Sequence, residues 1–138
     1  MIPRAGVTVE GLPEILAERL AAAVERAAKR LRCPGVGAEI SGMDEWQARA
    51  LNRKYRHKDR VAEVLSFSLP PSVPGGSVGE ILVCPQAAVR RARGMGLAPD
   101  RWMQELCVHG YLHLLGFRHD DPESSGLMFS LQKSLLRR

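Results

Sequence analysis

The sequence predicts a single α/β (α+β) domain over residues 1–138, in which a small mixed sheet packs against helices. Three observations lead to this prediction. Segments with helical periodicity alternate with short segments of strand-like alternation. The length of 138 residues is about one domain's worth, and 45% hydrophobic with 25% charged residues is the balance of a chain that buries one core. A Pro/Gly-rich loop between two strand-like segments indicates one hairpin.

The first half of the chain predicts two helices and two strands. Apolar residues recur at helical spacing over residues 12–32, and residues 33–35 (Cys-Pro-Gly) end this helix. Residues 36–40 alternate as a short strand, and residues 61–69 form a second one. Between them, Asp44 and Gln47 resemble a capping box that opens a helix. The residues of this helix that we expect to face inward are Trp46, Ala50, Leu51 and Tyr55.

The second half predicts one strand and three helices. After a loop at residues 70–76, residues 78–83 read as the second strand of the hairpin. Pro85 starts a helix that Gly94 and Gly96 end. Asp100 is expected to cap a helix that runs to about residue 115, where Gly116 allows a left-handed stop. A last helix begins near residues 121–122, and its expected core residues are Leu127, Met128, Leu131 and Leu135.

Composition limits the compartment and the partners. The longest uninterrupted apolar run has five residues, 20–24, far short of the roughly 20 that cross a bilayer. The N-terminus lacks the layout of a signal peptide, so we expect a cytoplasmic protein with no membrane partner. Three cysteines without a C-x-x-C pair match neither a disulfide framework nor a zinc ribbon. We expect Cys33, Cys84 and Cys107 to be small buried hydrophobic residues.

The net charge is +5, and 16 of the 20 cationic residues are arginine. Because the arginine fork binds phosphate bidentately, this excess is compatible with a nucleic-acid partner. It is not specific, since many proteins that bind no nucleic acid carry a similar charge. Residues 53–60 carry five cations against one anion, which makes a local concentration of positive charge.

Three of the four histidines fall within eleven residues and give the strongest signal in the sequence. On a helix, His109 and His113 differ by about 40° in azimuth and about 6 Å in height, so both can bind one ion from the same face. His119 lies beyond Gly116, where the chain can turn back and bring a third imidazole. Three nitrogen ligands leave the fourth position of a tetrahedral Zn²⁺ open, which is the catalytic arrangement. Nickel or copper could use the same ligands.

Two neighbours of this cluster affect its chemistry. Zinc proteases of the H-E-x-x-H kind carry a glutamate beside the first histidine, whereas this chain has Gly110, so a peptidase loses its general base. Glu105 lies on the same helix face and could hydrogen-bond a ligand's other ring nitrogen or remain a solvated acid. Cys107 is expected to face away from the ligands.

The chain resembles the YbeY endoribonucleases, the rRNA maturation factors. Residues 109–119 are similar to the family signature H-G-x-L-H-L-x-G-Y-D-H, and residues 51–56 to its L-N-x-x-Y-R. Residues 62–67 resemble T-D-V-L-S-F, residues 79–81 resemble G-D-I, and Met128 falls where a methionine follows the histidines. These blocks keep the family's order over more than half of the chain.

The resemblance implies a single-strand-specific, zinc-dependent endoribonuclease with one zinc ion per chain. It would process the 3′ end of small-subunit ribosomal RNA and serve ribosome quality control, with ribosomal RNA and the small subunit as partners. The metal ligands carried over are His109, His113 and His119, and the family's important arginine matches Arg56. From the chemistry of its guanidinium group, we expect Arg56 to bind a non-bridging phosphate oxygen through two hydrogen-bond donors. The candidates for contact with the RNA backbone are Arg53, Lys54, Tyr55, Lys58 and Arg60, with Arg90, Arg91 and Arg93.

The chain departs from the family pattern at three places. Thr-Asp is replaced by Ala62-Glu63, the aspartate of G-D-I by Glu80, and Tyr-Asp before the last histidine by Phe117-Arg118. The last change replaces the carboxylate that the family pattern places beside the metal with the cation of Arg118. Either Asp120 or Asp121 could substitute for it.

Several questions stay open at this point. One alternative is a zinc hydrolase of a peptide or small molecule; another is a ribosome-associated RNA-binding factor whose metal is structural. The attacking group is either water or the RNA 2′-hydroxyl.

Overall fold

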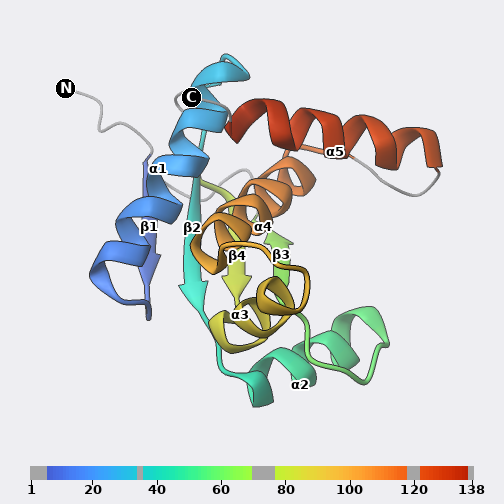
Figure 1. Cartoon of the computed structure of the whole chain (residues 1–138). Coiled ribbons are helices and arrows are strands. Elements are labelled where there is room, and N and C mark those ends of the chain that lie inside the picture. Colours follow the sequence, from blue (N-terminus) through green and yellow to red (C-terminus); the bar gives the residue numbers. More distant parts are fainter. Residues whose placement is uncertain (1–5, 34–35, 70–76, 118–121, 137–138) are drawn as a thin grey trace.

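The computed structural model describes residues 6–33, 36–69, 77–117 and 122–136. Its elements alternate as the sequence predicts, with one additional strand at the start (Figure 1). They are β1 (Val7–Glu10), α1 (Glu14–Arg30), β2 (Gly37–Gly42), α2 (Glu45–Arg56), β3 (Val64–Ser68), β4 (Ser77–Val83), α3 (Pro85–Gly94), α4 (Pro99–Leu114) and α5 (Pro122–Leu136). Within the described residues, none of the helices has the length and apolar character needed to span a membrane.

The four strands form one mixed sheet in the order β1-β2-β4-β3. The pairs β1–β2 and β2–β4 are parallel, and β3–β4 is the antiparallel hairpin that the Pro/Gly-rich loop indicated. Ser66 pairs with Ile81 in that hairpin. Within the described residues, β3 is therefore an edge strand that pairs with a neighbour on one side.

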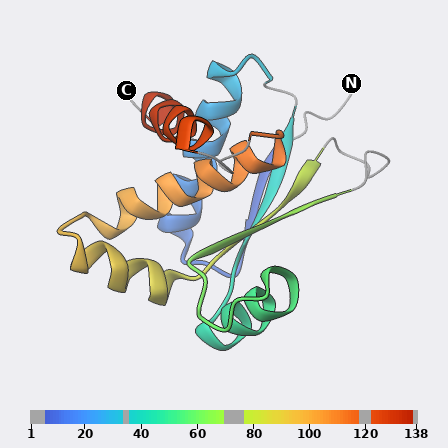
Figure 2. The same ribbon diagram turned by 90° about the vertical axis from the view of Figure 1, so that its right-hand side faces the viewer.

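The helices α1 and α4 cover one face of this sheet, and α3 and α5 pack against α4 (Figures 1 and 2). The core between these layers contains Ile40, Ile81, Tyr111 and Leu112, all at most 1% exposed. The hydroxyl of Tyr111 donates a hydrogen bond of 2.7 Å to the carbonyl oxygen of Val36, and this ties α4 to the start of β2. Burial raises the pKa of this phenol above its usual range. The helix that carries His109 and His113 is therefore held rigidly against the sheet.

On the opposite face of the sheet, α2 covers only the part near β3. A small second cluster joins Ala48 of α2 to Leu65 of β3, with Leu51 and Phe67 packed at its margin. The predicted capping box is confirmed, since the Asp44 side chain accepts from the Gln47 backbone and the Gln47 side chain from that of Asp44. The C-terminal end of α2 lies beside β3, where it can contribute to a site.

The predicted inward face of α2 is wrong for three of its four residues. Trp46 and Tyr55 are 80% and 53% exposed, and Ala50 is exposed as well. The buried positions are Ala48 and Asn52, and the Asn52 amide donates to the carbonyl oxygen of Arg60 at 2.9 Å. The helix α2 therefore faces the sheet with the small side chain of Ala48 and the hydrogen-bonded side chain of Asn52. Its large aromatic side chains point outward.

Two smaller expectations also need correction. Asp100 does not cap α4: the helix starts at Pro99 after Ala98, and Asp100 forms an ion pair with Arg19 of α1. Leu127 is 67% exposed, because α5 meets the core through Met128, Leu135 and Leu136, with Leu131 partly buried beside them. The left-handed stop at Gly116 is confirmed by its φ of 98°.

Candidate functional site

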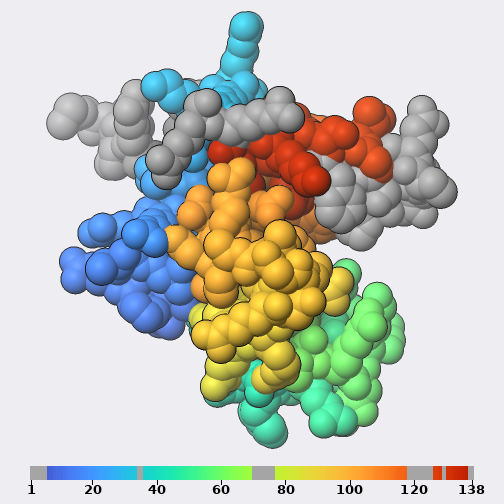
Figure 3. Space-filling view, in the orientation of Figure 1, coloured from blue at the N-terminus to red at the C-terminus, as the bar shows by residue number. Residues whose placement is uncertain are grey.

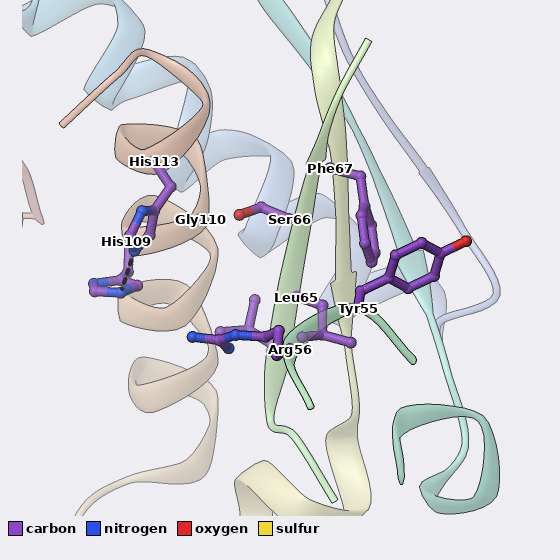
Figure 4. A pocket seen from close by; sticks show the side chains of 9 residues that line it. Tyr55, Arg56, Leu65, Ser66, Phe67, His109, Gly110 and His113 are labelled. Atoms are coloured by element: carbon purple, nitrogen blue, oxygen red, sulfur yellow. Dashed lines mark hydrogen bonds between the residues drawn. The ribbon is translucent and has the colours of Figure 1, made fainter. Parts of the chain in front are cut away.

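A cavity of about 400 Å³ lies between α4, the edge strand β3 and the C-terminal end of α2 (Figure 4). Its lining side chains come from three segments that are far apart in the sequence. They are Tyr55, Arg56, Val64, Leu65, Ser66, Phe67, His109, Gly110 and His113. The cavity thus brings two of the predicted metal ligands together with the predicted arginine.

The two histidines of α4 point to one place, as their spacing predicts. Nε2 of His109 lies 3.2 Å from Nε2 of His113, and the rings meet edge to face with centroids 4.7 Å apart. Two nitrogens bound tetrahedrally to one zinc, each at about 2.0–2.1 Å, would lie about 3.3–3.4 Å apart. The donor set and its separation therefore fit a zinc ion.

The third predicted ligand, His119, and the substituted position Arg118 lie outside the described residues. Within the described ranges, no group of three histidine, cysteine or carboxylate side chains could hold a metal. The described chain accordingly supplies two of the three predicted ligands.

Gln132 of α5 is a site residue that the sequence reasoning missed. It is only 3% exposed, and its Oε1 lies 3.0 Å from Nδ1 of His109. An amide oxygen only accepts hydrogen bonds, so this contact places the ring proton on Nδ1 and leaves the Nε2 lone pair directed at His113. A glutamine on the otherwise apolar inner face of α5 was the signal available in the sequence. Glu105, the earlier candidate for this support, is not in the cavity lining.

Arg56 is the last residue of α2, and its side chain extends toward α4 in Figure 4. The helix ends there because His57 adopts a left-handed conformation with φ of 58°. This turn leaves the exposed Arg56 guanidinium at the mouth of the cavity, on the same side as the histidine pair. A cation and two imidazoles thus face one space from two different helices.

The alternation of β3 divides its side chains between the two faces of the sheet. Val64 lies toward Gly110 of α4, and the Ser66 side chain points into the cavity from the same face (Figure 4). Phe67 lies on the other face, where the Tyr55 ring meets it edge-on with centroids 5.0 Å apart. This contact fixes the C-terminal turn of α2 against the strand and so helps to position Arg56.

The glycine beside the first ligand has a packing role. A Cβ on Gly110 would lie 3.1 Å from Cγ2 of Ile81 and 3.7 Å from a methyl group of Val64. Gly110, which stands where H-E-x-x-H proteases carry their general base, packs closely against the sheet. A side chain there would be crowded against Ile81, so the peptidase alternative loses support from the packing as well as from the sequence.

The predicted RNA-contact residues divide into different places. Among them, only Tyr55 lines the cavity beside Arg56, while Arg53 and Lys54 line a separate groove on α2. Lys58 and Arg60 are exposed in the segment that follows α2. Two of the three arginines of α3 form ion pairs with carboxylates, Arg90 with Glu45 and Arg91 with Glu63.

The acidic departures from the family pattern lie away from the cavity. Glu63 accepts a hydrogen bond of 2.7 Å from Nε1 of Trp102, so its carboxylate is turned toward α4 and α3. Glu80 pairs with Phe67 in the hairpin and is not in the cavity lining. Cys107 is fully buried in the core as expected, and this burial raises the pKa of its thiol to about 12. None of these three side chains contributes to the cavity.

Comparison with known proteins gives consistent matches. A family model described as endoribonuclease YbeY matches residues 9–138. The endoribonuclease YbeY of Halorhodospira halophila is 39% identical over 110 residues, which cover 74% of this chain and 71% of the relative. That of Thermobifida fusca is 38% identical over 109 residues, covering 72% and 70%.

Other relatives match over a smaller part of their length. The endoribonuclease YbeY of Neisseria meningitidis serogroup C is 38% identical over 92 residues, so this chain spans only 54% of that relative. The solution structure of TM1509 from Thermotoga maritima superposes with a TM-score of 0.67 and 29% identity, covering 94% of this chain and 86% of that one. The fold, the order of the motifs and the extent of the family match together show that this chain belongs to the endoribonuclease YbeY family.

Proposed function

We propose that this protein is a single-strand-specific, zinc-dependent endoribonuclease of the cytoplasm. Its substrate in this proposal is the 3′ end of small-subunit ribosomal RNA, and it takes part in ribosome quality control. The observation that carries the proposal is the convergence of Arg56 with His109 and His113 on one solvent-accessible cavity. The family's printed description as an endoribonuclease supports the same activity.

The donor set favours a catalytic over a purely structural metal. His109 and His113 face a cavity that opens to solvent, whereas a metal that only holds helices together is usually enclosed by four protein ligands. In the proposal, His119 is the third ligand. A bound zinc ion supplies positive charge that polarises a phosphoryl oxygen and lowers the pKa of water.

The protein's own side chains perform the other tasks. Arg56 holds a non-bridging phosphate oxygen with its planar fork and offsets the charge that grows there during cleavage. Gln132 keeps the His109 ring in the tautomer that directs Nε2 into the cavity. The Ser66 hydroxyl adds a neutral donor and acceptor to the wall opposite the histidines.

Cleavage of a single-stranded fragment of the rRNA 3′ end tests this function. We expect wild-type protein with zinc to cleave the fragment and His113→Ala to lose both zinc and cleavage, because one of three ligands is gone. His57→Asn is the matched control: His57 is the histidine outside the cluster, it does not line the cavity, and asparagine tolerates its left-handed backbone. The three proteins are purified in parallel, and zinc content is measured by elemental analysis.

Each outcome has a distinct meaning. Cleavage by the wild type and His57→Asn alone supports the proposal. Equal cleavage by all three proteins points to a contaminating nuclease and contradicts it. Tight RNA binding by zinc-loaded wild type without cleavage favours the RNA-binding assembly factor. A fragment with a single 2′-deoxy residue at the scissile position then identifies the attacking group, since lost cleavage implicates the 2′-oxygen.

A further inference from the structure

Trp46 is the most exposed large hydrophobic side chain of the described residues, at 80%. It lies in the first turn of α2. This helix is at the lower end of the molecule in Figure 1 and is the teal-to-green region of Figure 3. Within the described part of the chain its indole makes no hydrogen bond or ring contact. Tyr55 differs, because its ring contacts Phe67 and lies 5.1 Å from the Lys54 ammonium. The Trp46 ring is therefore an aromatic surface in contact with solvent.

A groove of about 670 Å³ adjoins this indole, and we call it the Trp46 groove. Its lining residues are Trp46, Arg49, Ala50, Arg53, Lys54 and Asp59. The groove carries three cations and one anion. Arg49 donates to both oxygens of Asp59, at 2.8 and 3.3 Å, and thereby holds the pKa of that carboxyl below its usual range. Since this pair neutralises itself, Arg53 and Lys54 give the groove its net positive charge.

The Trp46 groove is aligned with the cavity along α2. At 100° per residue, Trp46, Arg53 and Arg56 lie within about 80° of azimuth on the helix. At 1.5 Å per residue, Trp46 and Arg56 are about 15 Å apart along the axis, which a few nucleotides can span. One side of α2 therefore presents, in order, an aromatic ring, a cation and the arginine of the cavity.

This combination fits one class of ligand. Bases of a single strand stack on exposed aromatic rings regardless of sequence, while neighbouring cations follow the phosphates. The geometry points to the Trp46 groove as a subsite for single-stranded RNA, in which a base a few nucleotides from the scissile phosphate stacks on Trp46 and Arg53 binds the backbone. The inference rests on the proposed function, since it takes the same RNA strand to occupy the cavity at Arg56.

The test measures binding of RNA oligonucleotides of increasing length to the zinc-loaded protein, with zinc-loaded Trp46→Ala and Trp46→Phe. Wild-type protein is expected to gain affinity once the strand is long enough to reach from the cavity to α2. For these longer strands, we expect Trp46→Ala to bind about tenfold more weakly than the wild type. Trp46→Phe is expected to bind almost as tightly as the wild type, because a smaller ring still stacks. Leu127→Ala, an exposed apolar side chain on α5, is the control for loss of exposed surface.

Tryptophan fluorescence provides an independent readout. The protein has two tryptophans, and the other, Trp102, is partly buried and donates a hydrogen bond from its indole N–H to Glu63. RNA is expected to quench the emission of the wild type, and the quenching is expected to be absent in Trp46→Phe. Quenching at Trp46 without any cleavage would support the subsite while the proposed catalytic function fails.

Two results would overturn the inference. If Trp46→Ala binds long RNA as tightly as the wild type, the subsite is refuted although RNA cleavage stands, and the exposed indole belongs to a protein interface instead. If Trp46→Ala and Leu127→Ala weaken binding equally, the effect is not one of stacking. Failure of the wild type to bind RNA at any length would overturn the subsite and the proposed function together.

Discussion

Gln132 shows how one buried polar residue can set the chemistry of a neighbour on another helix. Its position on the inner face of α5 costs desolvation, which the hydrogen bond to Nδ1 of His109 offsets. The same bond selects the tautomer whose Nε2 lone pair faces His113. The orientation of the His109 ring on α4 therefore depends on the docking of α5.

We predict that Gln132→Leu keeps the fold but weakens zinc binding by about 10- to 100-fold, the usual effect of removing a partner of a metal-bound histidine. Leucine fills a similar volume and lacks the acceptor. Competition with a chromophoric zinc chelator measures the affinity, and circular dichroism checks the fold. Lys133→Ala, an exposed neighbour on α5, serves as control. Unchanged affinity in Gln132→Leu would remove Gln132 from the site.

We predict that Arg56→Ala retains zinc and loses at least about 100-fold in RNA turnover, the size of effect expected when one charge-stabilising donor is removed. The side chain is exposed at a helix end, so the stability of the fold should not change. Single-turnover cleavage measures the loss. Arg101→Ala on the exposed side of α4 is the matched arginine control. Turnover near the wild-type rate would show that Arg56 does not act in the reaction.

At the residue scale, the sequence predicts the placement of side chains whose spacing has a chemical reason. His109 and His113 lie together because four residues on a helix place them so. The sequence predicts Trp46 and Tyr55 on the inner face of α2, yet the phase of the helix is set by Ala48 and Asn52. That phase depends on what the helix meets across space, namely Leu65 and the carbonyl oxygen of Arg60.

At the scale of elements, the path of α4 over the sheet depends on glycines that have no side chain to obstruct it. A Cβ on Gly79 of β4 would lie 2.4 Å from a methyl group of Leu114 and 2.5 Å from the carbonyl oxygen of Phe67. Leu114 directly follows His113 in the chain. The close approach at Gly79 thus sets the height at which the second histidine sits above the sheet.

We predict that Gly79→Ala lowers the free energy of unfolding by about 1–3 kcal/mol, as overpacking does when backbone must move. Urea denaturation measures the change. Gly94→Ala at the end of α3 is the matched control, because its Cβ would meet no atom within 4 Å. That control should change stability by at most about 1 kcal/mol, and in the stabilising direction. Equal effects of the two substitutions would argue against the close contact with Leu114.

Elements with a strong local signal were predicted and those without one were missed. The capping box of α2, the hairpin β3–β4 and the glycine stop after α4 are all local in sequence, and they are confirmed. β1 has only four residues, Val7–Glu10. This is too short for an alternation of apolar and polar residues to be recognised in the sequence. The strand order β1-β2-β4-β3 results from long-range pairing, about which local patterns carry no information.

At the scale of the whole molecule, the positive charge and the cavity lie at the same end of α2. The net charge is only +5, but exposed cations gather between Arg53 and Arg60. In the proposed function, an RNA strand that reaches Arg56 passes these cations, and we expect the electrostatic contribution to binding to be concentrated there.

We predict that RNA affinity falls steeply and linearly on a log–log plot against salt concentration. Each phosphate neutralised on a single strand contributes about 0.7 to the slope, so Arg53→Ala should reduce the slope by about that amount. Fluorescence anisotropy over a salt series measures it. Arg101→Ala should leave the slope unchanged. A flat salt dependence of the wild-type protein would contradict a backbone-binding role for these cations.

The position of β3 at the edge of the sheet has one more consequence. An edge strand turns a row of backbone N–H and C=O groups outward, and β3 does so along the wall of the cavity. No side-chain substitution removes these groups. Alanine substitutions in the cavity will therefore leave the backbone N–H and C=O groups of β3 in place. A proline substitution deletes the N–H of its residue, so prolines can remove these donors one at a time.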